Sequence, residues 1–129
     1  MFEKFFEKYP DYQIVEKPTI DKINQYKNLL PKEIIWFWHN YGFGLFADGY
    51  LRLIDPDKVR GFTDQHVVNT GFDYISVAVS AFGDLFVWIR RFDGFLHLYD
   101  YRHSTHKMIS TGTGMNLLFD VKFVDSSYI

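Results

Sequence analysis

The chain has 129 residues, a formal net charge of −2 and no cysteine. The slight acidic excess argues against a nucleic-acid binder, because such proteins need a basic surface to neutralise phosphates. The lack of cysteine excludes disulfides and thiolate metal sites. We expect one domain over residues 1–129 and a cytoplasmic location, since the first residues do not resemble a signal peptide and no apolar run approaches the ~18 residues of a membrane span. Aromatic residues make up 20% of the sequence, and we expect some of them to be exposed.

Three helices are predicted in the first third of the chain. Residues 2–9 place four aromatic side chains at i, i+3, i+4 and i+7, which is the spacing of one helical face: Phe2, Phe5, Phe6 and Tyr9. Pro10 and Asp11 end this helix, and a linker follows. A short second helix is expected to begin near Thr19 or Asp21 and to include Tyr26. A third helix is expected to hold Pro31 in its first turn, and it repeats the amphipathic spacing with Ile34, Phe37, Trp38 and Tyr41.

Glycines mark a corner between the third helix and the first predicted strand. Gly42 suits a helix end, and Gly44 and the Asp48-Gly49 pair indicate turns. Residues 50–54 then alternate as in a half-buried strand, with Leu51 and Leu53 on one side and Tyr50 and Arg52 on the other. Asp55-Pro56 ends this strand, and residues 57–69 are predicted to form a weak helix or a loop.

The second half of the chain changes to a period of two, which predicts an antiparallel meander from Tyr74 to Tyr101. Gly83-Asp84 and Asp93-Gly94 are interpreted as two-residue hairpin turns between its three strands. A fourth strand is expected over residues 107–109. Residues 115–124 are ambiguous between helix and strand, and we favour helix for their first half. The expected fold is α+β, with N-terminal helices packed on a twisted, mostly antiparallel sheet.

Two-residue turns would fix which side chains share a face of the meander. The face expected to lie under the helices is mostly aliphatic: Ala78, Ser80, Phe82, Leu85, Val87, Ile89, Leu96 and Leu98. The opposite face is richer in aromatic residues: Val77, Val79, Ala81, Phe86, Trp88, Arg90, Phe92, Phe95, His97, Tyr99 and Tyr101. In this register Arg90 lies opposite His97, and Trp88 lies opposite Tyr99. The second face is either a packed layer or a surface that binds a partner, and the sequence leaves both open.

Sequence motifs for catalysis or metal binding are weak throughout the chain. His103 and His106 have a spacing that could share a metal, but no cysteine supports them. Ser104 lies in no nucleophile elbow, and residues 110–114 contain glycines without the lysine of a phosphate-binding loop. Five aspartates could suggest paired catalytic carboxylates, but each stands beside glycine or proline or at a helix start, where turn and capping roles explain it: Asp48, Asp55, Asp57, Asp84 and Asp93. We therefore expect no metal, no cofactor and no enzymatic activity.

Two segments carry a family resemblance. The first contains Leu30-Pro31, Phe37-Trp38, Tyr41-Gly42-Phe43-Gly44, Asp48-Gly49-Tyr50 and Asp55-Pro56; the second is residues 80–88, Ser-Ala-Phe-Gly-Asp-Leu-Phe-Val-Trp. Together they resemble the GAD-like domain family found in immunity proteins of type VI secretion DNase effectors. A looser likeness links them to the SUKH superfamily of immunity proteins. The resemblance covers about residues 20–101 and brings no catalytic motif.

The resemblance implies a cytoplasmic bacterial immunity protein that binds and neutralises a cognate toxin, expected to be a nuclease encoded by a neighbouring gene. We expect no direct contact with nucleic acid or membrane, and a monomer or weak homodimer. The candidate partner-binding residues are exposed on loops or on the aromatic strand face: Asp48, Tyr50, Arg52, Trp88, Arg90, His97 and Tyr99. Two alternatives stay open: a general SUKH-type interaction scaffold, and a hydrolase or small-ligand protein with a cleft lined by Trp88, His97 and Asp100.

Overall fold

The structure is a computed structural model, and it describes residues 2–60, 74–81, 83–90, 95–100 and 105–111. Its helices are α1 (Glu3–Lys8), α2 (Ile20–Tyr26) and α3 (Lys32–Asn40), with short 3₁₀ turns η1 (Ala47–Gly49) and η2 (Pro56–Val59). Its strands are β1 (Gln13–Glu16), β2 (Phe43–Phe46), β3 (Leu51–Leu53), β4 (Tyr74–Ser80), β5 (Leu85–Ile89), β6 (Phe95–Asp100) and β7 (Thr105–Thr111). The expected α+β class is confirmed.

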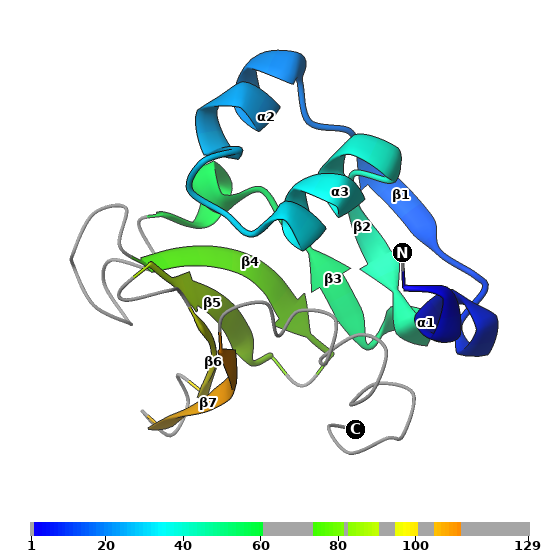
Figure 1. The fold of residues 1–129 in the computed structure, drawn as a ribbon. Helices are drawn as coiled ribbons and strands as arrows, with labels where there is room; N and C mark the ends of the chain where they lie inside the picture. The colour runs from blue at the N-terminus through cyan, green and yellow to red at the C-terminus, as the bar shows by residue number, and fades with distance from the viewer. Residues whose placement is uncertain (1, 61–73, 82, 91–94, 101–104, 112–129) are drawn as a thin grey trace.

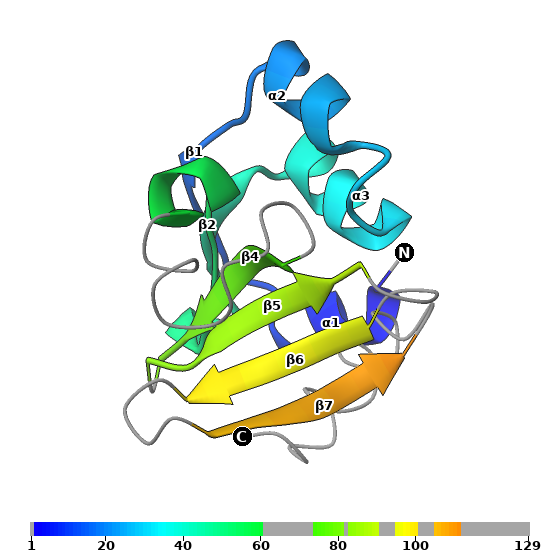
Figure 2. The ribbon, with the colours of Figure 1, turned by 90° about the vertical axis from the view of Figure 1, so that its left-hand side faces the viewer.

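The seven strands form one antiparallel sheet in chain order, from β1 at one edge to β7 at the other. Figure 1 shows α2 and α3 on one side of this sheet, and in Figure 2 strands β5, β6 and β7 lie side by side in front of α1. We call the side that packs on the helices the helix face and the opposite side the outer face. The meander is longer than predicted, because β1 and β2 were interpreted as a linker and a glycine corner.

The three helices bury the side chains that their spacing predicted. Phe5 and Phe37 are fully buried, and Phe6 and Tyr41 pack against the same core. The Phe2 and Phe37 rings stack with centroids 5.0 Å apart, which ties α1 to α3. Helix α2 begins where expected, because the Thr19 hydroxyl accepts a hydrogen bond from the Lys22 backbone N–H at 3.1 Å. Gly42, after the end of α3, has φ of +104°, as the predicted helix stop requires.

The two hairpins around β5 differ from the predicted two-residue turns. Val79 pairs with Leu85, and Ile89 pairs with Phe95, so each connection holds an odd number of residues. In the first connection the Ser80 N–H donates to the Asp84 carbonyl at 2.8 Å, and Gly83 takes the left-handed position with φ of +86°. Compared with a two-residue turn, a connection with an odd number of residues moves every side chain of the next strand to the opposite face of the sheet. Because both connections around β5 are odd, the side chains of β5 lie on the faces opposite to those predicted, whereas the side chains of β6 return to the predicted faces.

This inversion corrects the predicted faces of the meander. Phe86 and Trp88 lie in the core on the helix face, whereas they were expected on the opposite face. The aliphatic residues of β5 form a buried cluster on the outer face instead: Leu85, Val87 and Ile89, packed against Ile54, Tyr74, Val79 and Tyr99. A bulge between Ser76 and Ala78 also places Val77 in the helix-face core. The predicted pairs of Arg90 with His97 and of Trp88 with Tyr99 are wrong, since Val87 pairs with His97 and Leu85 with Tyr99.

Some expectations fall outside the described residues: those for residues 61–69 and 115–124, for Phe82, Phe92 and Tyr101, and for His103 and Ser104. The fourth meander strand is longer than expected and runs over Thr105–Thr111. Among the described helices, none has the length and apolar character needed to cross a membrane.

Candidate functional site

The structure distributes the seven sequence-predicted site residues over four places. Asp48 and Tyr50 lie in the loop between β2 and β3 and are exposed. A second group shares the outer face: Arg52, His97 and Tyr99. Arg90 is exposed just after β5, at the end of the sheet opposite to Asp48 and Tyr50. Trp88 lies in the core. The structure therefore brings part of the set together and separates Arg90 and Trp88 from it.

The loop between β2 and β3 has an unusual backbone. Ala47, Asp48 and Gly49 are three consecutive residues with positive φ, at +52°, +55° and +89°. Non-glycine residues in this region carry strain that the surroundings must hold in place. The Tyr50 carbonyl accepts a hydrogen bond from the Ala81 N–H at 2.9 Å, which ties this loop to the one between β4 and β5. The loop thus presents Asp48 and Tyr50 from a fixed end of the sheet.

A transverse row of paired residues crosses the sheet in continuous register. Successive strands contribute Gln13, Leu45, Arg52, Val79, Leu85, Tyr99 and His106. Arg52 and Tyr99 stand three strands apart in this row, which is roughly 14 Å at the usual strand spacing. Val79 and Leu85 separate them, so Arg52 and Tyr99 border an apolar strip of the outer face.

Trp88 requires a correction, because it was expected to contact a partner. Its side chain is 6% exposed and packs in the core on the helix face. His97 lies opposite Val87, on the other side of the sheet. A cleft lined by both Trp88 and His97, which the small-ligand alternative needed, therefore does not form.

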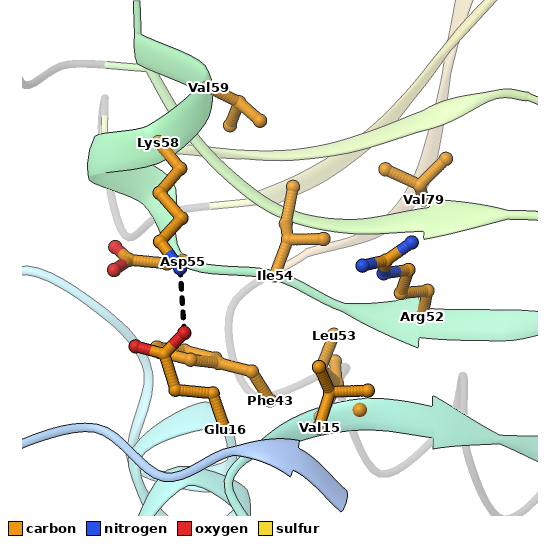
Figure 3. Close-up of a pocket in the computed structure, with 11 residues that line it drawn as sticks. Val15, Glu16, Phe43, Arg52, Leu53, Ile54, Asp55, Lys58, Val59 and Val79 are labelled. Atoms are coloured by element: carbon orange, nitrogen blue, oxygen red, sulfur yellow. Dashed lines mark hydrogen bonds and ion pairs between the residues drawn. The ribbon is translucent and has the colours of Figure 1, made fainter. Parts of the chain in front are cut away.

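A groove of about 340 Å³ opens on the outer face where β1, β3 and η2 meet (Figure 3). Its lining combines apolar and charged side chains: Val15, Glu16, Phe43, Gly44, Arg52, Leu53, Ile54, Asp55, Lys58, Val59 and Val79. Lys58 bridges to Glu16 at 2.6 Å and so joins η2 to β1. Arg52 is the residue of the predicted set that reaches this groove. Sequence reasoning missed the groove, because β1 was interpreted as a linker.

A second polar cluster joins α2 to η2, and its acidic members were expected only to cap and turn. Asp55 does cap η2, accepting the Asp57 N–H at 3.0 Å. In addition, Lys22 bridges both carboxylates, at 2.9 Å to Asp55 and 2.6 Å to Asp57. The Tyr26 hydroxyl donates to Asp57 and accepts from Arg60 at 2.6 Å. The Asp-Pro-Asp-Lys sequence signals the cap, but nothing in it indicates the partners on α2.

The surroundings of Asp57 favour its charged form. Partial burial raises the pKa of this carboxyl, but hydrogen bonds from Lys22, Tyr26 and Arg60 outweigh it and lower the pKa from 3.8 to about 2. Burial and the neighbouring Asp57 carboxylate raise the pKa of the Tyr26 hydroxyl. At neutral pH Tyr26 is thus a neutral donor to an ionised Asp57. We call this cluster the charged clamp, because its ion pairs and hydrogen bonds hold α2 against η2: Lys22, Tyr26, Asp55, Asp57 and Arg60.

We expect Asp57→Asn to make the free energy of unfolding less dependent on pH in the acid range. A carboxyl with a lowered pKa in the folded state stabilises that state above the unfolded pKa, and the contribution disappears as pH falls toward 2. The shift corresponds to about 2.5 kcal/mol, which we reduce to about 1–2 kcal/mol because a third of the side chain is exposed to solvent screening. Urea unfolding at a series of pH values measures this difference.

Asp11→Asn is the matched control, since Asp11 is exposed and lies far from the cluster in the sequence. It should retain the pH dependence of the wild type. A stability difference between wild type and Asp57→Asn that stays constant from pH 7 to pH 2 would contradict the assigned role of Asp57.

The fold and the site together define a class of protein: a small α+β domain with helices on one face of a long antiparallel meander, and a buried apolar cluster with a groove beside it on the other face. Residues 1–99 match the GAD-like domain, and the chain belongs to this family. The structure is also similar to the crystal structure of Atu4351 from Agrobacterium tumefaciens, with a TM-score of 0.63 and 21% sequence identity. That similarity covers 76% of this chain and 45% of Atu4351, and it shows the fold. No curated protein matches the sequence significantly.

Proposed function

We propose that the protein is a bacterial immunity protein that binds and neutralises a cognate toxin, with a type VI secretion nuclease as the expected target. The observation that carries this proposal is membership of the GAD-like domain family, which the sequence resemblance associates with immunity proteins of DNase effectors. An immunity protein acts by presenting a surface. Within the described residues, no group of three His, Cys, Asp or Glu side chains is placed to hold a metal ion.

The surface that we propose for the toxin is the outer face together with the loop between β2 and β3. It combines exposed or half-buried aromatic and charged side chains around a buried apolar cluster, and aromatic residues together with an arginine are the usual composition of interface hot spots. Tyr50 and Arg52 are exposed, and His97 and Tyr99 are half-buried beside the strip. Arg90 lies at the far end of the sheet and Trp88 in the core, so neither belongs to this surface.

Charge supports the same assignment. A nuclease is expected to bind DNA through a basic groove, and an acidic group such as Asp48 would complement that groove and speed association. Asp48 projects from a loop that a hydrogen bond fixes to the neighbouring corner. Inhibition would follow either from covering the active site or from locking the toxin in an inactive shape. Competition between DNA and this protein for the toxin separates the two routes.

The test is binding of the purified protein to the product of the adjacent gene. We expect a stable complex in the wild type, and a loss of affinity of at least about thirtyfold in the double variant Tyr50→Ala/Tyr99→Ala, because truncating even one hot-spot aromatic costs about 2 kcal/mol or more. Isothermal titration calorimetry measures the affinity, and circular dichroism shows whether the variant is folded.

Ile20→Ala is the matched control, since Ile20 is a large apolar side chain that is 73% exposed on α2, away from the proposed surface. Its affinity should equal that of the wild type. A folded wild-type protein with no affinity for the neighbouring gene product would contradict the proposed function and favour a general SUKH-type scaffold. Equal weakening by the control would move the interface to the helices.

A further inference from the structure

The groove on the outer face contains an unbalanced positive charge. Four of its lining residues are ionisable: Glu16, Arg52, Asp55 and Lys58. Glu16 and Lys58 neutralise each other at 2.6 Å, and Asp55 is paired with Lys22 at 2.9 Å. The Arg52 side chain has no ion-pair or hydrogen-bond partner among the residues that the structure describes. The remaining charge in this groove is therefore positive, and it favours a negatively charged occupant.

The setting of Arg52 favours a carboxylate with an apolar stem. Its guanidinium points toward Ile54, with Val79 beside it (Figure 3). A guanidinium binds a carboxylate through two parallel hydrogen bonds, and this pairing strengthens when apolar walls exclude water. Val15 lines the groove from β1 and is 56% exposed, so apolar surface continues from the groove onto the edge strand.

The size and position of the groove indicate what brings the carboxylate. At about 340 Å³ it lies at the small end of ligand pockets, which suits one or two side chains rather than a large cofactor. Arg52 also belongs to the transverse row on the outer face, beside Val79 and the apolar strip. An occupant of the groove would continue onto the exposed apolar side chains of the edge strand β1, where Ile14 is 37% and Val15 56% exposed, which points to a protein partner.

We propose that this groove is a socket for an acidic side chain of the partner protein, flanked there by apolar residues, whose carboxylate pairs with Arg52. The identity of the partner as a toxin rests on the proposed function, whereas the chemistry of the socket does not. The proposal assigns Arg52 a specific contact, which membership of the family does not.

The first experiment tests the socket without the toxin. Two capped peptides, acetyl-Leu-Glu-Val-amide and acetyl-Leu-Gln-Val-amide, are titrated to millimolar concentration and followed by ¹H–¹⁵N NMR. We expect the Glu peptide to shift the amide signals of Ile54 and Val79 and the Arg52 Nε–H signal, and the Gln peptide to shift them far less. Arg52→Glu should abolish the response. Shifts of equal size with both peptides, or none near the groove, would overturn the proposal.

The second experiment uses the neighbouring gene product, with Arg90→Glu as the matched charge reversal at an exposed arginine elsewhere on the sheet. We expect Arg52→Glu to weaken the complex by at least about thirtyfold and Arg52→Lys by about tenfold, because lysine keeps the charge and loses the bidentate geometry. Arg90→Glu should change affinity by less than about threefold. If the wild type binds the gene product tightly and Arg52→Glu binds it equally well, the socket is contradicted and the proposed function stands. If the Glu peptide binds at the groove but no complex forms with the gene product, the socket stands and the proposed function is contradicted.

Discussion

Trp88→Ala is expected to lower the free energy of unfolding by about 3–5 kcal/mol, the usual cost of truncating a buried tryptophan. Trp88 is 6% exposed, lies between Ile75 on β4 and Leu96 on β6, and belongs to the main core. The alanine leaves a cavity against the helix-face core, which the surrounding strands cannot fill without losing their register. Urea unfolding followed by circular dichroism measures the change.

Arg90→Ala gives the comparison, because Arg90 is two residues along the chain and exposed. It should change stability by less than about 0.5 kcal/mol. The two variants also separate the two possible registers of β5. With two-residue turns Trp88 would share the partner-facing side with Arg90, and its loss would reduce binding rather than stability. A stable Trp88→Ala protein would therefore contradict the observed register.

The length of a connection explains why one strand was assigned to the wrong faces while its neighbours were not. Gly83-Asp84 and Asp93-Gly94 are strong hairpin signals, and both do lie in hairpin connections. Their composition does not say whether the connection holds an even or an odd number of residues. Since β5 is apolar on both faces, its own side chains give no sign of the error. The alternating polarity that fixes register elsewhere is missing there.

Helices were predicted more reliably than short strands for a related reason. The spacing of Ile34, Phe37 and Trp38 repeats over two turns, and burial follows it. Strand β1 has four residues, all exposed, so no alternation of burial could mark it. The charged clamp could not be predicted from the sequence either, since it depends on where α2 packs against η2. Lys22 and Asp57 are 35 residues apart, and local pattern does not bring them together.

Gly44→Ala is expected to detach β1 from the sheet. A Cβ at this position would lie 2.2 Å from the Gln13 carbonyl oxygen and 3.0 Å from the Ile14 Cα, both backbone atoms of β1. Neither atom can rotate away as a side chain would, so the strand itself must move. We expect a loss of about 1–3 kcal/mol, typical of overpacking. Hydrogen exchange should show faster exchange at residues 13–16 than in the wild type.

Gly49→Ala is the matched control, because the added Cβ meets nothing within 4 Å. It still costs about 1 kcal/mol, since Gly49 has φ of +89°, which alanine adopts poorly. The two variants can thus be similar in total stability and still differ in location: the first should raise exchange in β1, the second near the loop between β2 and β3. Because Val15 and Glu16 of β1 line the groove beside Arg52, Gly44→Ala should also weaken the response to the Glu peptide, whereas Gly49→Ala should leave it intact. An unchanged exchange pattern at residues 13–16 in Gly44→Ala would contradict the close approach of the two strands.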